Sequence, residues 1–247
     1  MLKQEKIEGI VVSESNYSES SKILNILTCD RGLISVISKG CRKLKSKLRS
    51  VSGRLTYGYF YVYYKENRLS TLKEVDVIDG FRNIMFDLNN ISYATYLTEL
   101  TLQVVKHSYD DNIYNLYVSA LKKINDGFSP VIITSIIEIK YLEYLGIRPS
   151  IDSCSICGST KDIVTLSSVR GGYVCKNCCQ DETLVSQKCI KLVRMFYYVD
   201  IAKITSLDIK DDTIKEINKF IDSYYEDYSG LYLHSKKFLS NLNKIQS

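Results

Sequence analysis

The sequence predicts an α+β protein in which short β-strands come first and α-helices follow. Three observations support this prediction. Up to about residue 80, apolar and polar residues alternate at the period of strands. After Gly80, apolar residues recur at the period of helices. Two Cys-x-x-Cys pairs between residues 154 and 178 then indicate a small module within the helical part.

The N-terminal part contains five short runs rich in β-branched or aromatic residues. These runs cover residues 6–12, 22–28, 33–38, 55–65 and 69–78. Five strands in about 80 residues favour a small barrel, because closing a sheet protects its edges. We predict a five-stranded OB-type β-barrel over residues 1–80, and an SH3-like barrel fits the same pattern.

The remaining chain is expected to form an α-helical domain over residues 81–152 and 181–247. Its clearest helix follows Ser129, a suitable N-cap, begins with Pro130 and ends near Gly146. A later helix is expected to be capped by Asp212 or Thr213. A short last helix is expected to contain Phe238, Leu239, Leu242 and Ile245.

The four paired cysteines are candidate zinc ligands in an inserted module, residues 153–180. Seventeen residues separate Cys154-x-x-Cys157 from Cys175-x-x-Cys178, enough for a hairpin that brings the two pairs together. Four thiolates around one Zn²⁺ leave no open position, so the predicted site is structural. Unpaired buried cysteines and a thiol redox pair are the alternatives, and Cys179 is a second candidate for the fourth ligand.

The positive charge of the chain is concentrated in its first third. Residues 1–80 hold 14 Lys and Arg against 9 Asp and Glu, whereas residues 81–247 hold 19 of each. Residues 39–54, here called the basic segment, contain no acid and seven cations: Lys39, Arg42, Lys43, Lys45, Lys47, Arg49 and Arg54. This asymmetry favours nucleic acid as a partner, with a solvated surface as the alternative.

The strand expected over residues 55–65 is rich in aromatic residues. Alternation places Tyr57, Tyr59, Tyr61 and Tyr63 on one face, with Phe60 and Tyr64 on the other. One of these faces must be barrel core, so at most half of the rings are free to stack on bases.

Several classes of protein are disfavoured. The P-loop, G-x-S-x-G and G-x-G-x-x-G motifs are missing, and neither of the two histidines belongs to an H-x-E motif. We therefore expect no enzyme. No stretch reaches the roughly 18–20 apolar residues of a membrane span, and no signal peptide is recognised, so we expect a cytoplasmic, nucleoid-associated protein.

The whole chain resembles the bacterial recombination mediator RecO family. The resemblance lies in EGIVV at 8–12, SESSKIL at 18–24, GLISVISKG at 32–40, LKEV at 72–75 and YLEYLGIRP at 141–149, which leads into Cys154. The extra thiol of Cys179 and the extension of the basic run to Arg49 and Arg54 are departures.

The resemblance implies an OB domain, a helical domain and a zinc module without catalysis of covalent chemistry. It also implies binding of single- and double-stranded DNA, annealing of complementary strands, and action with RecR to help RecA replace the single-stranded-DNA-binding protein (SSB) at gaps and breaks. The acidic C-terminal tail of SSB is expected to bind the helical domain, near Arg148, Lys188, Lys191 and Arg194.

Two rival functions remain open from the residues alone. One is an RNA-binding OB-fold plus zinc-ribbon protein of translation or transcription, because charge does not distinguish RNA from DNA. The other is a redox enzyme that uses the Cys-x-x-Cys pairs.

Overall fold

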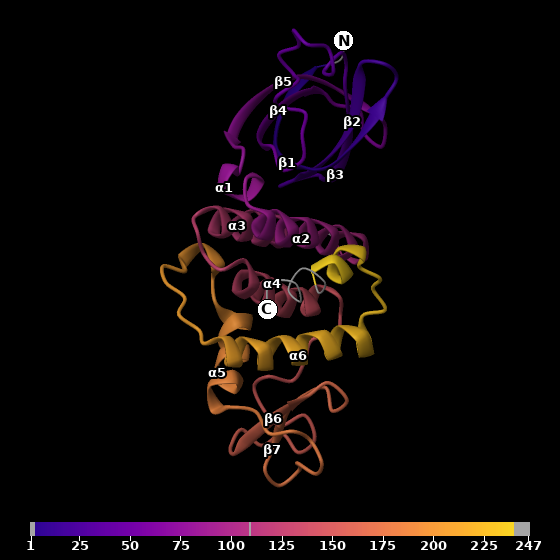
Figure 1. The fold of residues 1–247 in the computed structure, drawn as a ribbon. Helices are drawn as coiled ribbons and strands as arrows, with labels where there is room; N and C mark the ends of the chain where they lie inside the picture. The colour runs from indigo at the N-terminus through magenta and orange to yellow at the C-terminus, as the bar shows by residue number, and fades with distance from the viewer. Residues whose placement is uncertain (1–2, 109, 240–247) are drawn as a thin grey trace.

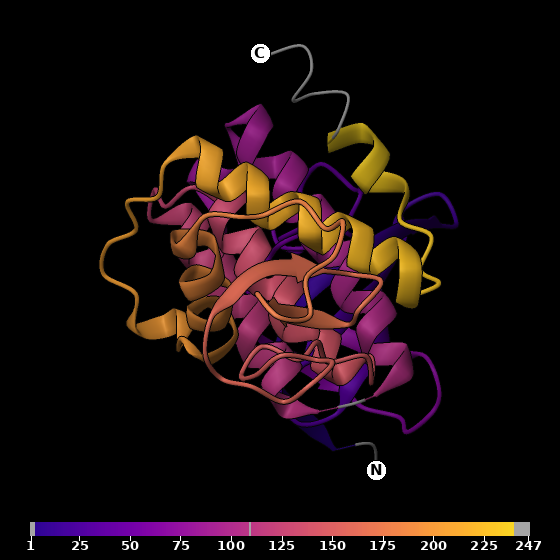
Figure 2. The ribbon, with the colours of Figure 1, turned by 90° about the horizontal axis from the view of Figure 1, so that it is seen from below.

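The structure, a computed structural model, describes residues 3–108 and 110–239 of the 247. The β-strands of the N-terminal part lie at one end, the helices form a middle layer, and a small hairpin lies at the opposite end (Figure 1). Figure 2, seen from the hairpin end, shows the hairpin in front of the helices with the N-terminal strands behind them. The predicted α+β class is confirmed.

Five strands form the N-terminal sheet: β1 (Gln4–Tyr17), β2 (Ser21–Thr28), β3 (Gly32–Ser38), β4 (Tyr57–Tyr63) and β5 (Ser70–Asp79). They pair in the order β1-β2-β3-β5-β4, and β4 pairs again with β1. The seam between β3 and β5 is parallel and holds only two residue pairs. The sheet is therefore a barrel with one short seam, as in the partly open five-stranded OB type.

The barrel interior contains a small apolar cluster that includes Ile7, Leu24, Val36 and Phe60. Residues of β1 and β2 outside this cluster face the helices instead, because Ile10, Val12 and Leu27 belong to the apolar core of the helical part. One strand therefore contributes to two cores.

The helices follow directly on β5. They are α1 (Arg82–Met85), α2 (Leu88–His107), α3 (Asp111–Asn125), α4 (Pro130–Tyr144), α5 (Gln187–Tyr198), the 3₁₀ helix η1 (Ile201–Lys203) and α6 (Asp211–Tyr228). Residues 234–239 are also helical. The predicted start and end of α4 are confirmed, since Ser129 is its N-cap and Gly146 follows with a φ of 73°.

The C-terminal part differs from the prediction at the N-cap of α6, and part of its expected last helix lies outside the described residues. The N-cap of α6 is Lys210, so the predicted cap at Asp212 or Thr213 is wrong. Asp211 and Asp212 lie in the first helical turn, where carboxylates favour the positive end of the helix dipole. Of the expected last helix, Phe238 and Leu239 are helical, whereas Leu242 and Ile245 lie outside the described residues.

The barrel is joined to the helices by polar as well as apolar contacts. The hydroxyl of Tyr57 donates to the Glu8 carboxylate over 2.7 Å, and the hydroxyl of Tyr114 in α3 donates to the same oxygen over 3.3 Å. Tyr57 also stacks on Phe81 with ring centroids 6.2 Å apart. These contacts hold the end of the barrel against α3 and against Phe81, which precedes α1.

Candidate metal centre and nucleic-acid interface

Two turns present the paired cysteines. Cys154 and Cys157 lie before β6 (Ile163–Ser167), in a turn where the N–H of Gly158 donates to the Cys154 carbonyl over 2.9 Å. Cys175 ends β7 (Gly172–Cys175), and the N–H of Cys178 donates back to its carbonyl over 3.0 Å. The antiparallel β6–β7 hairpin brings the two turns together.

The four sulfur atoms have the spacing of a metal centre. All lie within 4.8 Å of one another, and the sulfurs of Cys157 and Cys175 are 3.6 Å apart. A tetrahedral Zn²⁺ with Zn–S bonds of about 2.3 Å separates its sulfurs by about 3.8 Å. All eight cysteines of the chain lie in the described part, and none forms a disulfide there. The cluster therefore fits a metal ion such as zinc.

The four thiols of the cluster are close enough to shift each other's pKa values. Burial opposes ionisation of Cys154, but N–H donors of Cys157, Cys175 and Ile156 lower its pKa to about 6. The neighbouring sulfurs, that of Cys157 first, raise the pKa of Cys178 to about 12. Four adjacent thiolates repel one another unless a cation lies between them. A metal ion would supply that charge.

Cys179 lies outside the cluster. Its thiol points to the carbonyl of Glu182, with the sulfur 3.9 Å from the oxygen. The structure thus groups Cys178, not Cys179, with the other three cysteines. Cys29, Cys41 and Cys189 are also outside the group.

The basic segment leaves the barrel after Ser38 and returns to it at Ser52, whose hydroxyl oxygen lies 2.8 Å from that of Ser38. It follows β3, in which Ile37 pairs with Thr71 at the start of β5. It precedes β4, in which Tyr57 pairs with Asp79 at the end of β5. Lys39 to Arg49 therefore lie on a loop whose two ends meet beside β3, and Arg54 follows where the chain enters β4.

The seven cations of the basic segment are exposed and uncompensated. None of them has an ion-pair partner among the described residues. The guanidinium of Arg42 donates to the carbonyl of Ser18 over 3.3 Å, which leaves its charge unneutralised. Such a row of like charges is relieved by bound phosphates.

The aromatic strand divides as alternation predicts, with one exception. Phe60 is buried in the barrel core, whereas Tyr59, Tyr61 and Tyr63 are half-buried on the outside. The ammonium of Lys6 lies 3.9 Å from the centre of the Tyr59 ring. Tyr57 is the exception, because the helical part covers it.

The cations proposed for an acidic tail lie beside the cysteine module. Arg148 and Arg194 both pair with Asp152, over 3.3 and 2.9 Å. Lys188 and Lys191 are exposed on α5. The structure brings the two arginines together on one carboxylate, so their charge is partly compensated.

Sequence reasoning missed the junction between barrel and helices. Glu8 joins the two parts, and a pocket beside Arg54 is lined by the barrel, α2 and the last helix. These segments are far apart in sequence, so no local motif marks the pocket. The one sequence feature that points to the pocket is the acid-free run, which ends at Arg54.

None of the helices in the described residues is sufficiently long and apolar to span a membrane. The fold and the site define a class: an OB-type barrel joined to a helical body that contains a four-cysteine centre. Comparison with known families agrees. Residues 1–81 match the model described as "Recombination protein O N terminal", and residues 85–237 match "Recombination protein O C terminal".

Curated relatives match over nearly the whole chain. DNA repair protein RecO of Listeria monocytogenes serotype 4b is 36% identical over 247 residues, covering 98% of this chain and 96% of the relative. DNA repair protein RecO of Bacillus pumilus is 33% identical, covering 98% and 95%. The chain therefore belongs to the recombination protein O family of DNA repair and recombination proteins.

Proposed function

We propose that the chain is a recombination mediator that binds single-stranded DNA along the basic segment and anneals complementary strands. The observation that carries the proposal is the group of seven exposed cations of the basic segment, which have no acidic partner in the part of the chain that the structure describes. Bound phosphates would release counterions, and a cationic surface lowers the repulsion between two approaching strands. Double-stranded DNA would be bound through the same phosphate contacts.

The partners follow from membership of the family. With RecR, the protein would help RecA replace SSB at gaps and breaks, without catalysing covalent chemistry. The acidic tail of SSB would bind the helical domain near Arg148, Lys188, Lys191 and Arg194, leaving the barrel free for DNA.

The four cysteines would hold one structural Zn²⁺. With four sulfur ligands the metal has no open position, so it would stabilise the hairpin module rather than take part in a reaction. Free, reactive dithiols in the purified protein would instead favour the redox alternative.

Annealing tests the proposed function. Complementary oligonucleotides coated with SSB should anneal faster with the protein than without it. The variant Arg42→Glu, Lys43→Glu, Lys45→Glu should lose most of this activity. A control with the same change of charge on α6 and its N-cap, Lys210→Glu, Lys215→Glu, Lys219→Glu, should retain it.

Two results would count against the proposal. Equal annealing by both triple variants would move the active surface away from the basic segment. Preference for RNA over DNA of the same sequence, in competition binding, would favour the RNA-binding alternative.

A further inference from the structure

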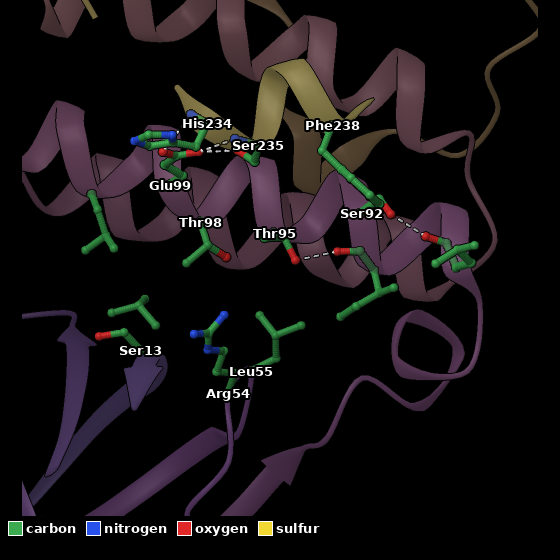
Figure 3. Close-up of a pocket in the computed structure, with 14 residues that line it drawn as sticks. Ser13, Arg54, Leu55, Ser92, Thr95, Thr98, Glu99, His234, Ser235 and Phe238 are labelled. Carbon is green, nitrogen blue, oxygen red and sulfur yellow. Dashed lines mark hydrogen bonds between the residues drawn. The ribbon is translucent and has the colours of Figure 1, made fainter. Parts of the chain in front are cut away.

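An apolar pocket lies where the barrel meets α2 and the last helix (Figure 3). Its volume is about 670 Å³, within the range of about 300–1,000 Å³ that is usual for small-ligand sites. The barrel contributes Val12, Arg54 and Leu55, α2 contributes Leu88 among others, and the last helix contributes Phe238. Junctions between structural units are common places for binding sites.

The pocket offers apolar walls and, among the described residues that line it, one cation without a partner. Three hydroxyls of α2 line it, but each already donates to the carbonyl four residues earlier: those of Ser92, Thr95 and Thr98. Arg54 is exposed and makes no hydrogen bond or ion pair with the part of the chain that the structure describes. Figure 3 shows its side chain extending from the barrel toward α2.

The position of Arg54 is fixed by its neighbour. Leu55 is buried and has a φ of 64°, a left-handed conformation that costs energy for a branched residue. Its N–H donates to the carbonyl of Val11 in β1 over 2.8 Å. This anchor places Arg54 at the pocket as the last cation of the basic segment.

The aromatic wall of the pocket is held in place from the other side. Phe238 is 53% exposed although it belongs to a helix that is firmly anchored. The Glu99 carboxylate accepts hydrogen bonds from the N–H groups of His234 and Ser235 at the start of that helix. Lys236 pairs with Glu138 over 3.2 Å. The helix that carries Phe238 is therefore anchored, and its exposed ring offers a surface on which a flat group can stack.

These features together select a nucleotide of a single strand. A nucleotide combines an anionic phosphate with a flat base, matching Arg54 and the apolar walls with Phe238. The loop of the basic segment closes at Ser52, and Arg54 at the pocket follows two residues later, so a strand held on the loop's cations would bring bases to the pocket. Bases paired and stacked in a duplex cannot enter, since their faces are covered.

We propose that the junction pocket takes one unstacked nucleobase from a single strand bound along the basic segment. The base stacks on Phe238, and a phosphate beside it pairs with Arg54. The proposal rests on the proposed function, because the segment must first bind the strand. The three α2 hydroxyls that line the pocket already donate within their helix, so they give the site no preference for one base over another.

Two short DNA strands test this proposal with the full-length protein. One consists only of abasic residues, and the other carries a single 2-aminopurine among abasic residues, so that its one base can reach the pocket in any register. The wild type should bind the second strand about fivefold more tightly or better, as expected for one base stacked on one aromatic ring. Its 2-aminopurine should be shielded from acrylamide quenching.

Three variants test whether the binding preference and the shielding of 2-aminopurine arise at the pocket. Phe238→Ala should abolish both the preference and the shielding. Phe86→Ala is the matched control, because Phe86 is 88% exposed and does not line the pocket, and it should retain both. Leu88→Glu places a carboxylate at the pocket mouth in the first turn of α2, where acids are tolerated, and should also abolish the preference.

The failures of the two proposals are distinguishable. Equal binding of both strands by the wild type, with salt-dependent affinity, would overturn the base pocket and leave the phosphate-binding segment intact. Equal loss in Phe238→Ala and Phe86→Ala would also overturn it. Absence of salt-dependent binding to the abasic strand would instead overturn the proposed function.

Discussion

At the scale of single residues, the Glu99 carboxylate holds the start of the helix that carries Phe238. Burial raises its pKa, but hydrogen bonds from Ser235 and His234 outweigh this effect and leave the pKa below the ordinary value of 4.5. A carboxylate with a lowered folded-state pKa stabilises the protein above the unfolded-state pKa. This contribution is lost as the pH falls through the folded-state pKa.

Glu99→Gln should therefore lower the free energy of unfolding by about 1–2 kcal/mol at pH 7, because a charge-assisted acceptor is lost. The difference from wild type should shrink when the pH falls below 4.5. Urea denaturation at pH 7 and pH 4 measures both values, with the exposed Glu226→Gln as control. A difference that is the same at both pH values would contradict the role of the charge.

Substitution of the adjacent residues Cys178 and Cys179 tests which thiols bind the metal. Purified protein should contain about one zinc per chain, and Cys154→Ser or Cys178→Ser should lose most of the metal and part of the stability. Cys179→Ser should keep it, because its thiol lies outside the cluster. Metal analysis after gentle purification measures this, and a folded wild type without metal would refute the zinc centre.

At the scale of elements, the β6–β7 hairpin is attached through a close backbone contact. A Cβ on Gly172 would lie 2.2 Å from the carbonyl oxygen of Ser150, and the φ of Gly172 is 142°. The N–H of Tyr173 donates to that same oxygen over 2.8 Å. A side chain at Gly172 would therefore break the attachment of the cysteine module.

Gly172→Ala should lower the free energy of unfolding by at least about 2 kcal/mol, from steric clash and backbone strain together. Gly171→Ala should cost about 1 kcal/mol, because its φ of 76° is strained but nothing lies within 4 Å of its Cβ. Denaturant titration of the two variants measures the difference. Equal stability of the two variants would show that the close contact with Ser150 does not affect the free energy of unfolding.

Local patterns predicted the elements well and their junction poorly. Period-2 alternation separated Phe60, which lies in the barrel core, from Tyr59, Tyr61 and Tyr63, and the Ser129-Pro130 signal located α4. The cysteine pairs came together because a hairpin is a local structure. Alternation placed Tyr57 on the same face as Tyr59, Tyr61 and Tyr63, but its burial comes from Phe81 and α3, which no local period reports.

At the scale of the whole molecule, the expected binding surfaces for DNA and for the acidic tail lie at different ends. The basic segment connects β3 to β4 of the barrel, whereas Lys188, Lys191 and Arg194 lie on α5 near the cysteine hairpin (Figure 1). We propose that residues 1–80 form the DNA-binding domain, residues 81–152 with 181–247 the helical domain that binds the tail, and residues 153–180 the zinc module. DNA and an acidic tail should then bind without competing.

A tail peptide of SSB tests this separation. Lys188→Glu with Lys191→Glu should weaken the peptide about tenfold or more while leaving affinity for single-stranded DNA unchanged. Charge reversal at Arg42, Lys43 and Lys45 should weaken binding of single-stranded DNA and leave the affinity for the peptide unchanged. Fluorescence anisotropy with labelled peptide and labelled oligonucleotide measures both, and loss of both ligands in either variant would indicate one shared surface.

The salt dependence of single-stranded DNA binding tests the central claim, phosphate binding by the basic segment, most directly. If about three to five cations contact phosphates, log affinity should fall against log salt with a slope of roughly −2 to −3.5. Arg42→Glu, Lys43→Glu, Lys45→Glu should flatten the slope by about 2, whereas Lys210→Glu, Lys215→Glu, Lys219→Glu should leave it unchanged. An unchanged slope and affinity in the first triple variant, with the protein folded, would contradict the account.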